Sequence, residues 1–551
     1  MLLSNLNLLA TAPGGVARLR ELILTLAVQG KLVPQDAADE LASVLLAKIG
    51  AEKDRLIAEG KIKLGKPLAE ISEDDKSFAL PTGWEWVRLA NIVQVLNGRA
   101  YGKQELLDAG TPVLRVGNLF TSNHWYYSTL ELEPAKYCEQ GDLLYAWSAS
   151  FGPFIWSGPR AIYHYHIWKL EPFSPDGFDT SYFHTYLKEK TAEIKAAGHG
   201  VSMVHMTKEK MERIVVPYPP LAEQTRIVTR VEELMQLCDA LEAKGRLEAA
   251  QHARLVSTLL ATLTDSPNPQ ALAENWQRVS THFDLLLDRP EAVDALEQTL
   301  LQLAVRGLLV PQDPQDEPAS ALMSRIRAEK DRLIAEGKIK REKPLAAIAE
   351  EEKPFALPVA WEWVRMQEAF DVRDGTHDTP KYVEKNGVPL ITSRNFQAGK
   401  ICFKNVKLIS HADHELIMRR SRVDRYDILY SMIGGNIGNQ VLVDTDREFS
   451  IKNVALFKYV SRMYTSPSYL NLFLETVTLG LQGQAVGGAQ PFVSLSLLRS
   501  VPFPLPPFTQ QSRIVARVAS LRRLCADLRQ RLAARQAIQA QLAQALIQKA
   551  A

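Results

Sequence analysis

Two stretches of the chain repeat apolar residues at helical spacing. They cover residues 18–29 and 292–306, and each ends near a glycine, Gly30 or Gly307, with a proline soon after. A glycine just past the last periodic residue, followed by proline, is typical of a helix C-terminus. The pattern therefore predicts two similar helices, one in each half of the chain.

Two longer stretches, residues 221–265 and 508–551, space their apolar residues alternately four and three apart. This spacing is the seam of a coiled coil and predicts that the two helices pack against each other, although an ordinary amphipathic surface helix is the alternative. Roughly 40 residues at 1.5 Å each would make a rod of about 60 Å. The predicted interface positions are Ile227, Val231, Leu234, Cys238, Leu241, Ile514, Val518, Leu521, Cys525 and Leu528.

Between the helical stretches, short apolar runs alternate with Gly, Pro or Asp, a pattern typical of strands. Strands are predicted at residues 113–116, 143–147, 161–170, 428–433, 441–443 and 454–459, and helices at 181–195 and 468–479. These runs fall in two inserts, residues 82–216 and 359–503. At about 135 and 145 residues, both inserts are long enough to bury a core of their own.

The chain is an internal repeat. Residues Ala51–Lys63 recur without a change at Ala328–Lys340, an offset of 277. The same offset relates residues 26–28 to 303–305, 33–36 to 310–313, 78–81 to 355–358 and 84–88 to 361–365; an offset of 287 relates 217–231 to 504–518. The two inserts share only a few aligned residues, such as Asn118 with Asn395. Alike frames can bind one partner twice, whereas unlike inserts can bind two different targets.

Composition narrows the class of protein. The 551 residues carry a net charge of +2 and are 46% hydrophobic, which excludes a strongly basic nucleic-acid binder but not a local basic surface. The four cysteines form no C-x-x-C pair, which suits a reducing cytosol. No apolar run approaches the ~20 residues of a membrane span, and the first residues lack a signal-peptide pattern. We expect a soluble cytoplasmic protein.

Catalytic motifs are weak. Gly60–Lys66 is close to a phosphate-binding loop, but Pro67 stands where a Ser or Thr would hold magnesium. His164 and His166 would share one strand face and could bind a metal, yet the aligned residues of the second half are Asn453 and Ala455. Polar strand positions are therefore the favoured interpretation. His411 and His414 are interpreted as surface residues. We predict no catalytic residue, no metal site and no cofactor in this chain.

Candidate DNA-binding residues lie mainly in Gly-rich loops that mix cationic, aromatic and amide side chains. Arg and Lys can bind guanine edges and phosphates, and Gln can read adenine edges. Polar turns and a solvated helix face are the alternatives. The candidates are Arg99, Tyr101, Lys103, His199 and Ser202 in the first insert, and Thr376, His377, Lys381, Tyr382, Arg394, Arg419, Arg420, Arg422, Gln484 and Gln490 in the second.

The arrangement resembles the specificity (S) subunit of type I restriction-modification systems. The resemblance lies in Leu-Pro-x-x-Trp-Glu-Trp-Val-Arg at residues 80–88 and 357–365, and in the Pro-x-Pro-Pro tail with its following Gln-x-Arg-Ile-Val at 217–228 and 504–515. It covers essentially the whole chain. It implies an α+β fold in which a pair of long antiparallel coiled-coil helices separates two target-recognition domains.

The resemblance also implies a function and a set of partners. The expected protein is non-catalytic, reads a bipartite site on double-stranded DNA, and docks two methyltransferase subunits and through them two motor-nuclease subunits. S-adenosylmethionine would belong to the methyltransferase, and ATP and Mg to the motor-nuclease. The expected domains are an N-terminal helical arm 1–79, a recognition domain 80–220, a long helix 221–265, a central arm 266–356, a second recognition domain 357–507 and a second long helix 508–551.

Two other functions fit the same residues. One is a specificity module for another methylase or phage-defence system, and the other is a coiled-coil scaffold without a role on DNA. The N-terminal arm and its repeat around residues 275–356 exceed the minimal family pattern. Closing a ring or docking a methyltransferase subunit is the role we expect for them.

Overall fold

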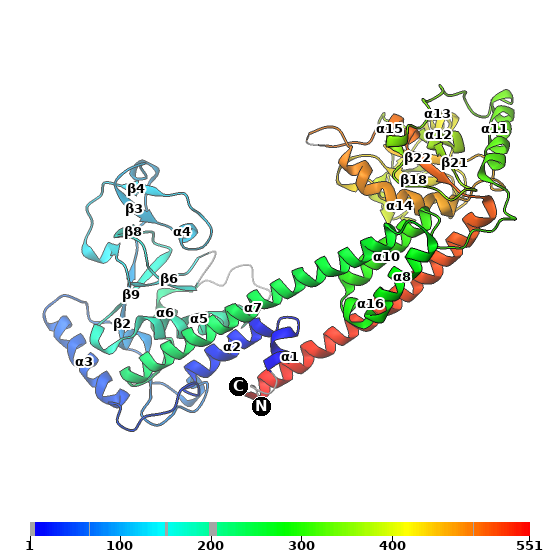
Figure 1. The fold of residues 1–551 in the computed structure, drawn as a ribbon. Helices are drawn as coiled ribbons and strands as arrows, with labels where there is room; N and C mark the ends of the chain where they lie inside the picture. The colour runs from blue at the N-terminus through cyan, green and yellow to red at the C-terminus, as the bar shows by residue number, and fades with distance from the viewer. Residues whose placement is uncertain (1–5, 66, 149–151, 198–205, 489, 551) are drawn as a thin grey trace. The chain divides into compact units, whose positions relative to one another are not determined.

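The computed structural model describes residues 6–65, 67–148, 152–197, 206–488 and 490–550. The chain divides into two compact units, residues 1–248 with 536–551 and residues 249–535. Each unit contains one insert and its helical frame (Figure 1). The predicted α+β fold, with two sheet-rich domains and long helices, is confirmed.

The frame helices form where the periodic pattern predicts them. They are α2 (Gly15–Val28) and α3 (Ala42–Ala58) in the first copy, and α10 (Pro290–Val305) and α11 (Ala319–Ala335) in the second. Gly30 and Gly307 follow α2 and α10 with φ of 67° and 74°, a left-handed conformation that favours glycine. An added Cβ at Gly30 would lie 2.5 Å from the Pro81 ring. Glycine is therefore required both by the turn and by the close approach of the insert's first residues.

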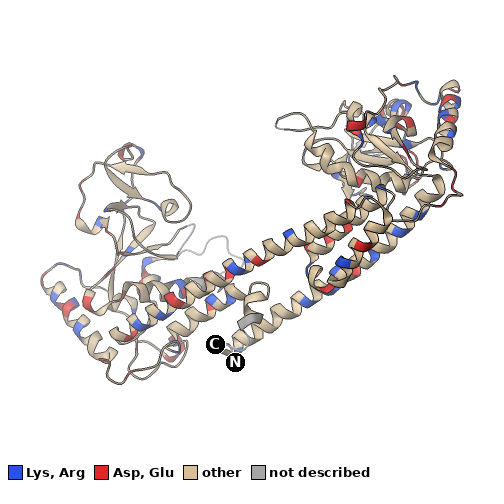
Figure 2. Cartoon of the chain, in the orientation of Figure 1, with Lys and Arg blue, Asp and Glu red and all other residues tan. Residues whose placement is uncertain are grey.

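The frame surfaces carry both signs of charge. Blue and red bands follow one another along α3 and α11 (Figure 2). Arg55 of α3 pairs with Glu52 and Glu59, and Arg332 of α11 repeats these pairs. The side chains neutralise one another locally, which agrees with the small net charge.

The first insert contains a four-stranded antiparallel sheet in the order β2-β9-β6-β7. A second sheet has the order β4-β3-β8-β5, with β3 and β8 parallel. Strand β1 pairs with β10, so the two ends of the insert meet in one ribbon. The strands are β1 (Glu85–Arg88), β2 (Val93–Asn97), β3 (Thr111–Leu114), β4 (Tyr126–Ser128), β5 (Tyr137–Cys138), β6 (Leu143–Ala146), β7 (Gly152–Ile155), β8 (Ala161–Tyr163), β9 (Ile167–Pro172) and β10 (Val215–Tyr218).

The second insert repeats this plan. Its antiparallel sheet β12-β21-β18-β19 matches the first, and its second sheet β13-β17-β14-β20 again contains one parallel pair, β14 with β20. Strands β11 and β22 close the insert. The strands are β11 (Glu362–Arg365), β12 (Phe370–Asp374), β13 (Tyr382–Val383), β14 (Val388–Ile391), β15 (Phe396–Gln397), β16 (Lys400–Ile401), β17 (Leu408–Ile409), β18 (Ile428–Ser431), β19 (Gln440–Leu442), β20 (Ser450–Ile451), β21 (Val454–Tyr459) and β22 (Pro502–Leu505).

One helix in each insert is anchored to the closing ribbon. The hydroxyl of Tyr182, in α5 (Thr180–Ala197), donates to the Pro217 carbonyl at 2.9 Å, and Tyr469, in α14 (Pro467–Gly483), donates to Pro504 at 3.1 Å. Both tyrosines are fully buried, so the hydrogen bond satisfies a hydroxyl that water cannot reach. The remaining helices are α1 (Leu6–Thr11), α4 (Val116–Phe120), α6 (Lys208–Glu212), α8 (Pro269–Thr281), α9 (Phe283–Leu286), α12 (Met366–Ala369), α13 (His411–Ser421) and α15 (Leu495–Ser500).

The long helices are α7 (Leu221–Thr264) and α16 (Phe508–Ala550). Part of the α16 seam packs against α7, as predicted, and both seams also pack against other elements of their own unit. In the first unit, Ile227, Val231, Leu234 and Cys238 join the core that holds α2 and the first insert, and Leu241 is half-buried. In the second unit, Ile514 and Val518 join the core of the second insert, while Leu521, Cys525 and Leu528 pack in a cluster with α10 and the last turns of α7.

The packing of the seams is explained by the arms. Each arm supplies an apolar helix, α2 or α10, that packs against the seam of the long helix of its own repeat. The seam spacing correctly predicted buried faces on both long helices. It did not indicate that the arm helices would pack on the same faces, because the arm and the opposite long helix present similar apolar stripes.

None of the described helices has both the length and the apolar composition needed to cross a lipid bilayer.

Candidate nucleic-acid interface

In the first domain, the loop after β2 meets the turn between β8 and β9. The Arg99 backbone N–H donates to the Tyr163 carbonyl at 3.1 Å, and the Tyr165 N–H donates to the Arg99 carbonyl at 3.0 Å. The Arg99 guanidinium lies 5.3 Å from the Tyr101 ring and pairs with Glu105 at 2.7 Å. Lys103 is exposed in the same loop. The candidates Arg99, Tyr101 and Lys103 therefore lie together at one end of the sheet.

This turn corrects the prediction of a single strand over residues 161–170. Strand β8 ends at Tyr163 and β9 begins at Ile167, so His164 and His166 lie in the connection and not on a strand face. The described residues contain no cluster of three or more His, Cys, Asp or Glu side chains arranged to hold a metal ion. Burial is the first cause that lowers the pKa of His164, to about 4, and it also lowers the pKa of His166. Both imidazoles are neutral near pH 7.

The second domain has the corresponding contact. The Thr376 N–H donates to the Ile451 carbonyl at 3.0 Å, and the Asn453 N–H donates to the Thr376 carbonyl at 3.2 Å. Comparing these hydrogen bonds with those of Arg99 shows that Lys452 corresponds to His164. The alignment of His164 with Asn453 was therefore wrong by one residue; Asn453 corresponds to Tyr165.

In the second domain, Asp374 forms hydrogen bonds with two of the candidate residues, His377 and Arg420. One carboxylate oxygen accepts from His377 at 2.8 Å and the other accepts from Arg420, which comes from the end of α13. Asp374 is 7% exposed, whereas the side chains of His377 and Arg420 are 58% and 60% exposed. A buried carboxylate thus holds two exposed side chains, both predicted candidates, in fixed positions at the surface.

The other candidates of the second insert are spread over its surface. Tyr382 is exposed with the Lys407 ammonium 4.2 Å from its ring, and Lys381 precedes it. Arg394 is exposed in the turn after β14, and Arg419 and Arg422 are exposed at the end of α13. Gln484 and Gln490 are exposed near the end of α14. His199 and Ser202 lie outside the described residues.

Two histidines of α13 differ from each other. His411 is exposed, as predicted. His414 is buried, contrary to the prediction, and its Nδ1 lies 2.9 Å from the Ser450 hydroxyl. A surface position was inferred because no acidic or cysteine residue stands at a fixed spacing from it, but its hydrogen-bond partner is 36 residues away.

Sequence reasoning missed Arg115 and His124. Both line a cavity of about 310 Å³ in the first domain together with His164 and His166. The only sequence signal for this segment is that Asn118 and Asn395 occupy corresponding positions of the two inserts. Asn118 accepts from the Arg115 N–H at 3.1 Å and donates to the His124 carbonyl at 2.7 Å, so it shapes the loop that carries both residues.

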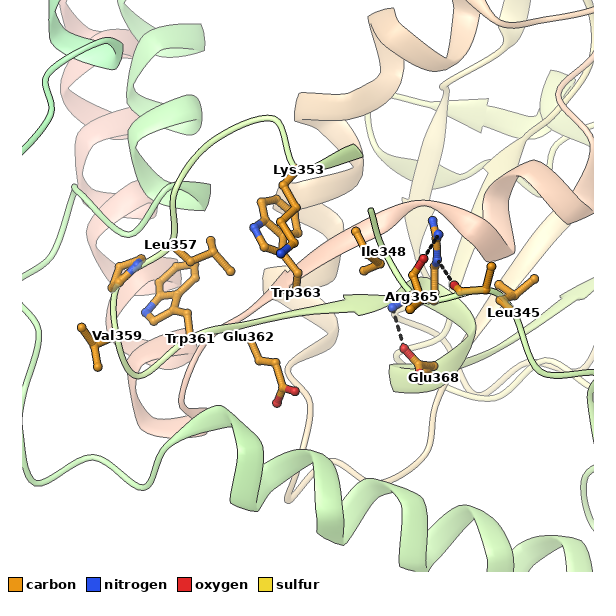
Figure 3. Close-up of a pocket in the computed structure, with 13 residues that line it drawn as sticks. Leu345, Ile348, Lys353, Leu357, Val359, Trp361, Glu362, Trp363, Arg365 and Glu368 are labelled. Atoms are coloured by element: carbon orange, nitrogen blue, oxygen red, sulfur yellow. Dashed lines mark hydrogen bonds between the residues drawn. The ribbon is translucent and has the colours of Figure 1, made fainter. Parts of the chain in front are cut away.

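A second cavity, of about 590 Å³, lies on the frame (Figure 3). The connector at residues 345–353 runs beside β11, and Arg365 holds it there. The guanidinium donates to the carbonyls of Ala346 and Ala347 at 3.1 and 3.3 Å, and to both oxygens of Glu352 at 2.7 and 2.8 Å. This hydrogen-bonded arginine lowers the pKa of Glu352 to about 2. Trp361 and Trp363 form part of the lining.

The first frame repeats the arginine clamp. Arg88 donates to the carbonyls of Ala69 and Glu70 at 2.8 and 3.0 Å and pairs with Asp75 at 3.0 Å. The charged connectors at residues 61–75 and 338–352 are therefore straps pinned to the first strand of each insert. The strap and clamp are present twice in the chain.

The fold and the twin loop clusters define a class: two-domain α+β proteins with duplicated frames and divergent polar loops. The model of the type I restriction modification DNA specificity domain matches residues 81–252. The chain is 35% identical to the type I restriction enzyme EcoAI specificity subunit of Escherichia coli over 97% of this chain and 93% of that protein. It is 34% identical to the EcoEI specificity subunit of the same organism, with the same shares covered.

A solved structure, the HsdS subunit from Thermoanaerobacter tengcongensis, is 18% identical with a TM-score of 0.39, covering 86% of this chain and 98% of that chain. The extent and identity of the match to the two Escherichia coli proteins show the family. The chain belongs to the specificity subunits of type I restriction enzymes.

Proposed function

We propose that this chain reads a bipartite site on double-stranded DNA in the cytoplasm, has no catalytic activity of its own, and docks two methyltransferase subunits. Motor-nuclease subunits join through the methyltransferases. S-adenosylmethionine, ATP and Mg then belong to those partners. Each domain reads one half of the site.

One observation carries the proposal: the same frame contacts occur twice, while the loops at the end of each sheet differ. In both clamps the arginine Nε and Nη2 donate to two successive backbone carbonyls of the connector. The sheets β2-β9-β6-β7 and β12-β21-β18-β19 also have the same order. By contrast, His164 corresponds to Lys452 and Arg99 to Thr376. Repeated frames support a partner bound twice, and different loops support two DNA sequences.

We assign DNA recognition to the loop clusters because they expose hydrogen-bond donors whose positions are fixed by buried side chains. Arg420 keeps most of its guanidinium donors free while Asp374 fixes one of them. Arginine donating to O6 and N7 of guanine is the commonest specific contact in the major groove. Because the net charge is only +2, we expect tight binding to need partners that surround the duplex.

Partner docking is proposed for the duplicated frames, including the groove beside β11. Its lining contains Trp361, Trp363 and the fully exposed Val359. The Trp363 indole N–H is buried without a hydrogen-bond partner among the described residues. An unsatisfied donor in a groove lined by tryptophans favours a bound polypeptide, because Trp is enriched at the centres of protein interfaces.

The experiment that tests the function is a methylome. The chain is expressed with its neighbouring methyltransferase gene in a host without DNA methylation, and N6-methyladenine is mapped genome-wide. A split motif that is methylated only when this chain is present supports the proposal. A complex that co-purifies without adding methylation would favour a scaffold, and a contiguous motif would contradict the two-domain reading.

The long helices are proposed to set the spacer between the half-sites. Rigid modules carried on a rod of fixed length contact DNA at a fixed separation. Inserting four residues into α7 after Gly245 should change the number of unspecified base pairs and leave both half-sites unchanged. An unchanged spacer in the methylome would contradict this part of the proposal.

A further inference from the structure

The cavity of about 310 Å³ in the first domain is lined by residues from three segments. These are the β3–α4 turn with Arg115, the loop before β4 with Ser122 and His124, and the β8–β9 turn with His164 and His166. The Tyr126 ring lies 4.7 Å from His124 and 5.4 Å from the Arg115 guanidinium. The segment 115–126 and the distant β8–β9 turn thus both contribute polar side chains to one cavity.

The lining of this cavity contains no carboxylate. Its ionisable side chains are one arginine, three histidines and one tyrosine. Arg115 is exposed and forms no ion pair with any of the described residues. Nearby cations of the domain are neutralised: Arg99 pairs with Glu105 and Lys169 with Glu171. The cavity is therefore a local site for a negative group in a chain of nearly balanced charge.

The polar groups of the lining can donate hydrogen bonds inward. Asn118 is committed to shaping the loop, and the Ser122 oxygen accepts from the His124 N–H at 3.2 Å, which leaves the hydroxyl hydrogen free. Each neutral imidazole has one N–H donor. Arg115 has five. A ligand rich in acceptors matches this set.

We infer that the cavity holds a phosphate of the DNA backbone beside the half-site read by the first domain. The inference rests on the proposed function and names the part of the DNA that this site binds. A phosphodiester is convex, negatively charged and has only acceptor oxygens, whereas base edges present donors as well. The cavity adjoins the Arg99–Lys103 loop, since His164 pairs with Arg99 in a β-bridge, so a seated phosphate would place that loop next to the bases.

The second domain supports the same role for this position. Lys452 corresponds to His164, as the matching hydrogen bonds show, and its ammonium donates to the Thr379 hydroxyl. A cation at this turn in one domain and donors in the other are compatible with a phosphate contact. Phosphate contacts set the register of a protein on the duplex and carry no sequence information.

The test uses the full chain with its methyltransferase partner and the Arg115→Ala variant. Affinity is measured by fluorescence anisotropy between about 50 and 200 mM salt, on a duplex with the mapped site and on a scrambled duplex. We expect Arg115→Ala to lower the affinity for both duplexes by a similar factor, about tenfold. The slope of log affinity against log salt should become shallower by about 0.9, the value for one phosphate.

Arg160→Ala is the matched control. Arg160 precedes β8, at the opposite end of the strand from His164, and lies 4.0 Å from the Tyr137 ring. The Arg160→Ala variant removes one positive charge from the same domain but outside the cavity, so the slope of log affinity against log salt should not change. Arg115→Lys should keep the slope, which separates loss of charge from loss of fold.

A methylphosphonate scan of the duplex locates the contact. At one backbone position near the first half-site, the loss of affinity caused by the methylphosphonate and the loss caused by Arg115→Ala should not be additive. An unchanged salt slope for Arg115→Ala would overturn the inference. So would a methylome in which this variant relaxes one base position while binding to scrambled DNA is unaltered. Failure of the unaltered complex to methylate any split motif would instead overturn the proposed function, whatever Arg115 does.

Discussion

The two halves of the chain solve the same folding problem with different residues. Arg20 of α2 pairs with Glu242 of α7 at 3.2 Å. At the corresponding places in the second half, Glu297 of α10 pairs with Arg529 of α16 at 2.5 Å. The contact is retained and its charges are exchanged. The arm-to-helix contact is therefore what the fold needs, and the exchanged signs favour each arm packing on its own long helix, since a crossed pairing would bring like charges together.

A second difference lies beneath the repeated tryptophans. The Trp84 indole donates to Glu223 at 2.9 Å, and the Trp361 indole donates to Gln510 at 2.9 Å. Burial raises the pKa of Glu223, whereas Gln510 has no charge to desolvate. The two side chains have nearly the same shape and both accept the indole hydrogen. Hydrogen-bond geometry is thus retained where the charge is not.

The loops differ most of all. The first domain presents neutral His164 and His166 and an Arg115 that forms no ion pair with any described residue, and the second presents Arg420 and His377 held by a buried Asp374. Frames are constrained by packing within the repeat, while loops at the end of the sheet are constrained by what they bind. The comparison teaches that recognition can change without changing the frame.

The largest expected effect comes from erasing this difference. Replacing residues 359–503 with a copy of residues 82–216 should give a chain whose two halves read the same sequence. Methylome mapping should then show complete loss of the original second half-site and a repeat of the first in its place. Retention of the original second half-site would show that the inserts do not carry the specificity.

Arg365→Ala should destabilise the second unit by about 3 kcal/mol, because the carbonyls of Ala346, Ala347 and Ser500 and the Glu352 carboxylate lose the buried guanidinium that donates to them. Arg88→Ala should cost less, since Arg88 has a single 3.0 Å contact to Asp75 and Arg365 binds Glu352 with two nitrogens. Urea unfolding of each variant, followed by hydrogen exchange at the straps, checks this order. Equal losses in the two halves would contradict the role given to the paired contact.

Arg420→Ala should weaken discrimination at the second half-site by about 2 kcal/mol, the value of one good base contact, and leave the first half-site unchanged. Competition binding with duplexes altered in one half at a time measures this. Arg425→Ala is the control, because Arg425 is exposed nearby and pairs with Asp446 at 3.0 Å. An equal loss on both half-sites would assign Arg420 to stability or to phosphate.

The smallest effect concerns the exchanged charges. Arg20→Glu should destabilise the first unit by about 0.2–1 kcal/mol, the range for exposed pairs. Adding Glu242→Arg should restore part of this loss, because the double variant has the arrangement of Glu297 and Arg529. Thermal unfolding at low and high salt checks both steps, since salt should reduce the coupling. If the double variant is no more stable than Arg20→Glu alone, the exchange of signs is not functional.

Part of the candidate site could be predicted from sequence. The loop of Arg99 and Tyr101 and the loop of Thr376 and His377 were identified because Gly-rich turns mix with cationic and aromatic residues. Asp374 was not identified as an anchor, because a single aspartate at the end of a strand is indistinguishable from a turn residue. Arg420 was a candidate from its arginine-rich run, but its contact with Asp374 spans 46 residues and depends on the packing of α13.

By itself, the sequence determined that the chain is a repeat, where its frame helices and most of its strands lie, and that its inserts differ. These properties can be seen within the chain alone. Apolar periodicity follows helix and strand geometry, and an internal repeat is found by comparing the sequence with itself. Only the tertiary structure decided which surfaces meet. The seam of α7 packs with α2, and His164 joins Arg115 in one cavity. Such contacts depend on competition between similar apolar faces and on turns of one residue more or less, which spacing along the chain does not specify.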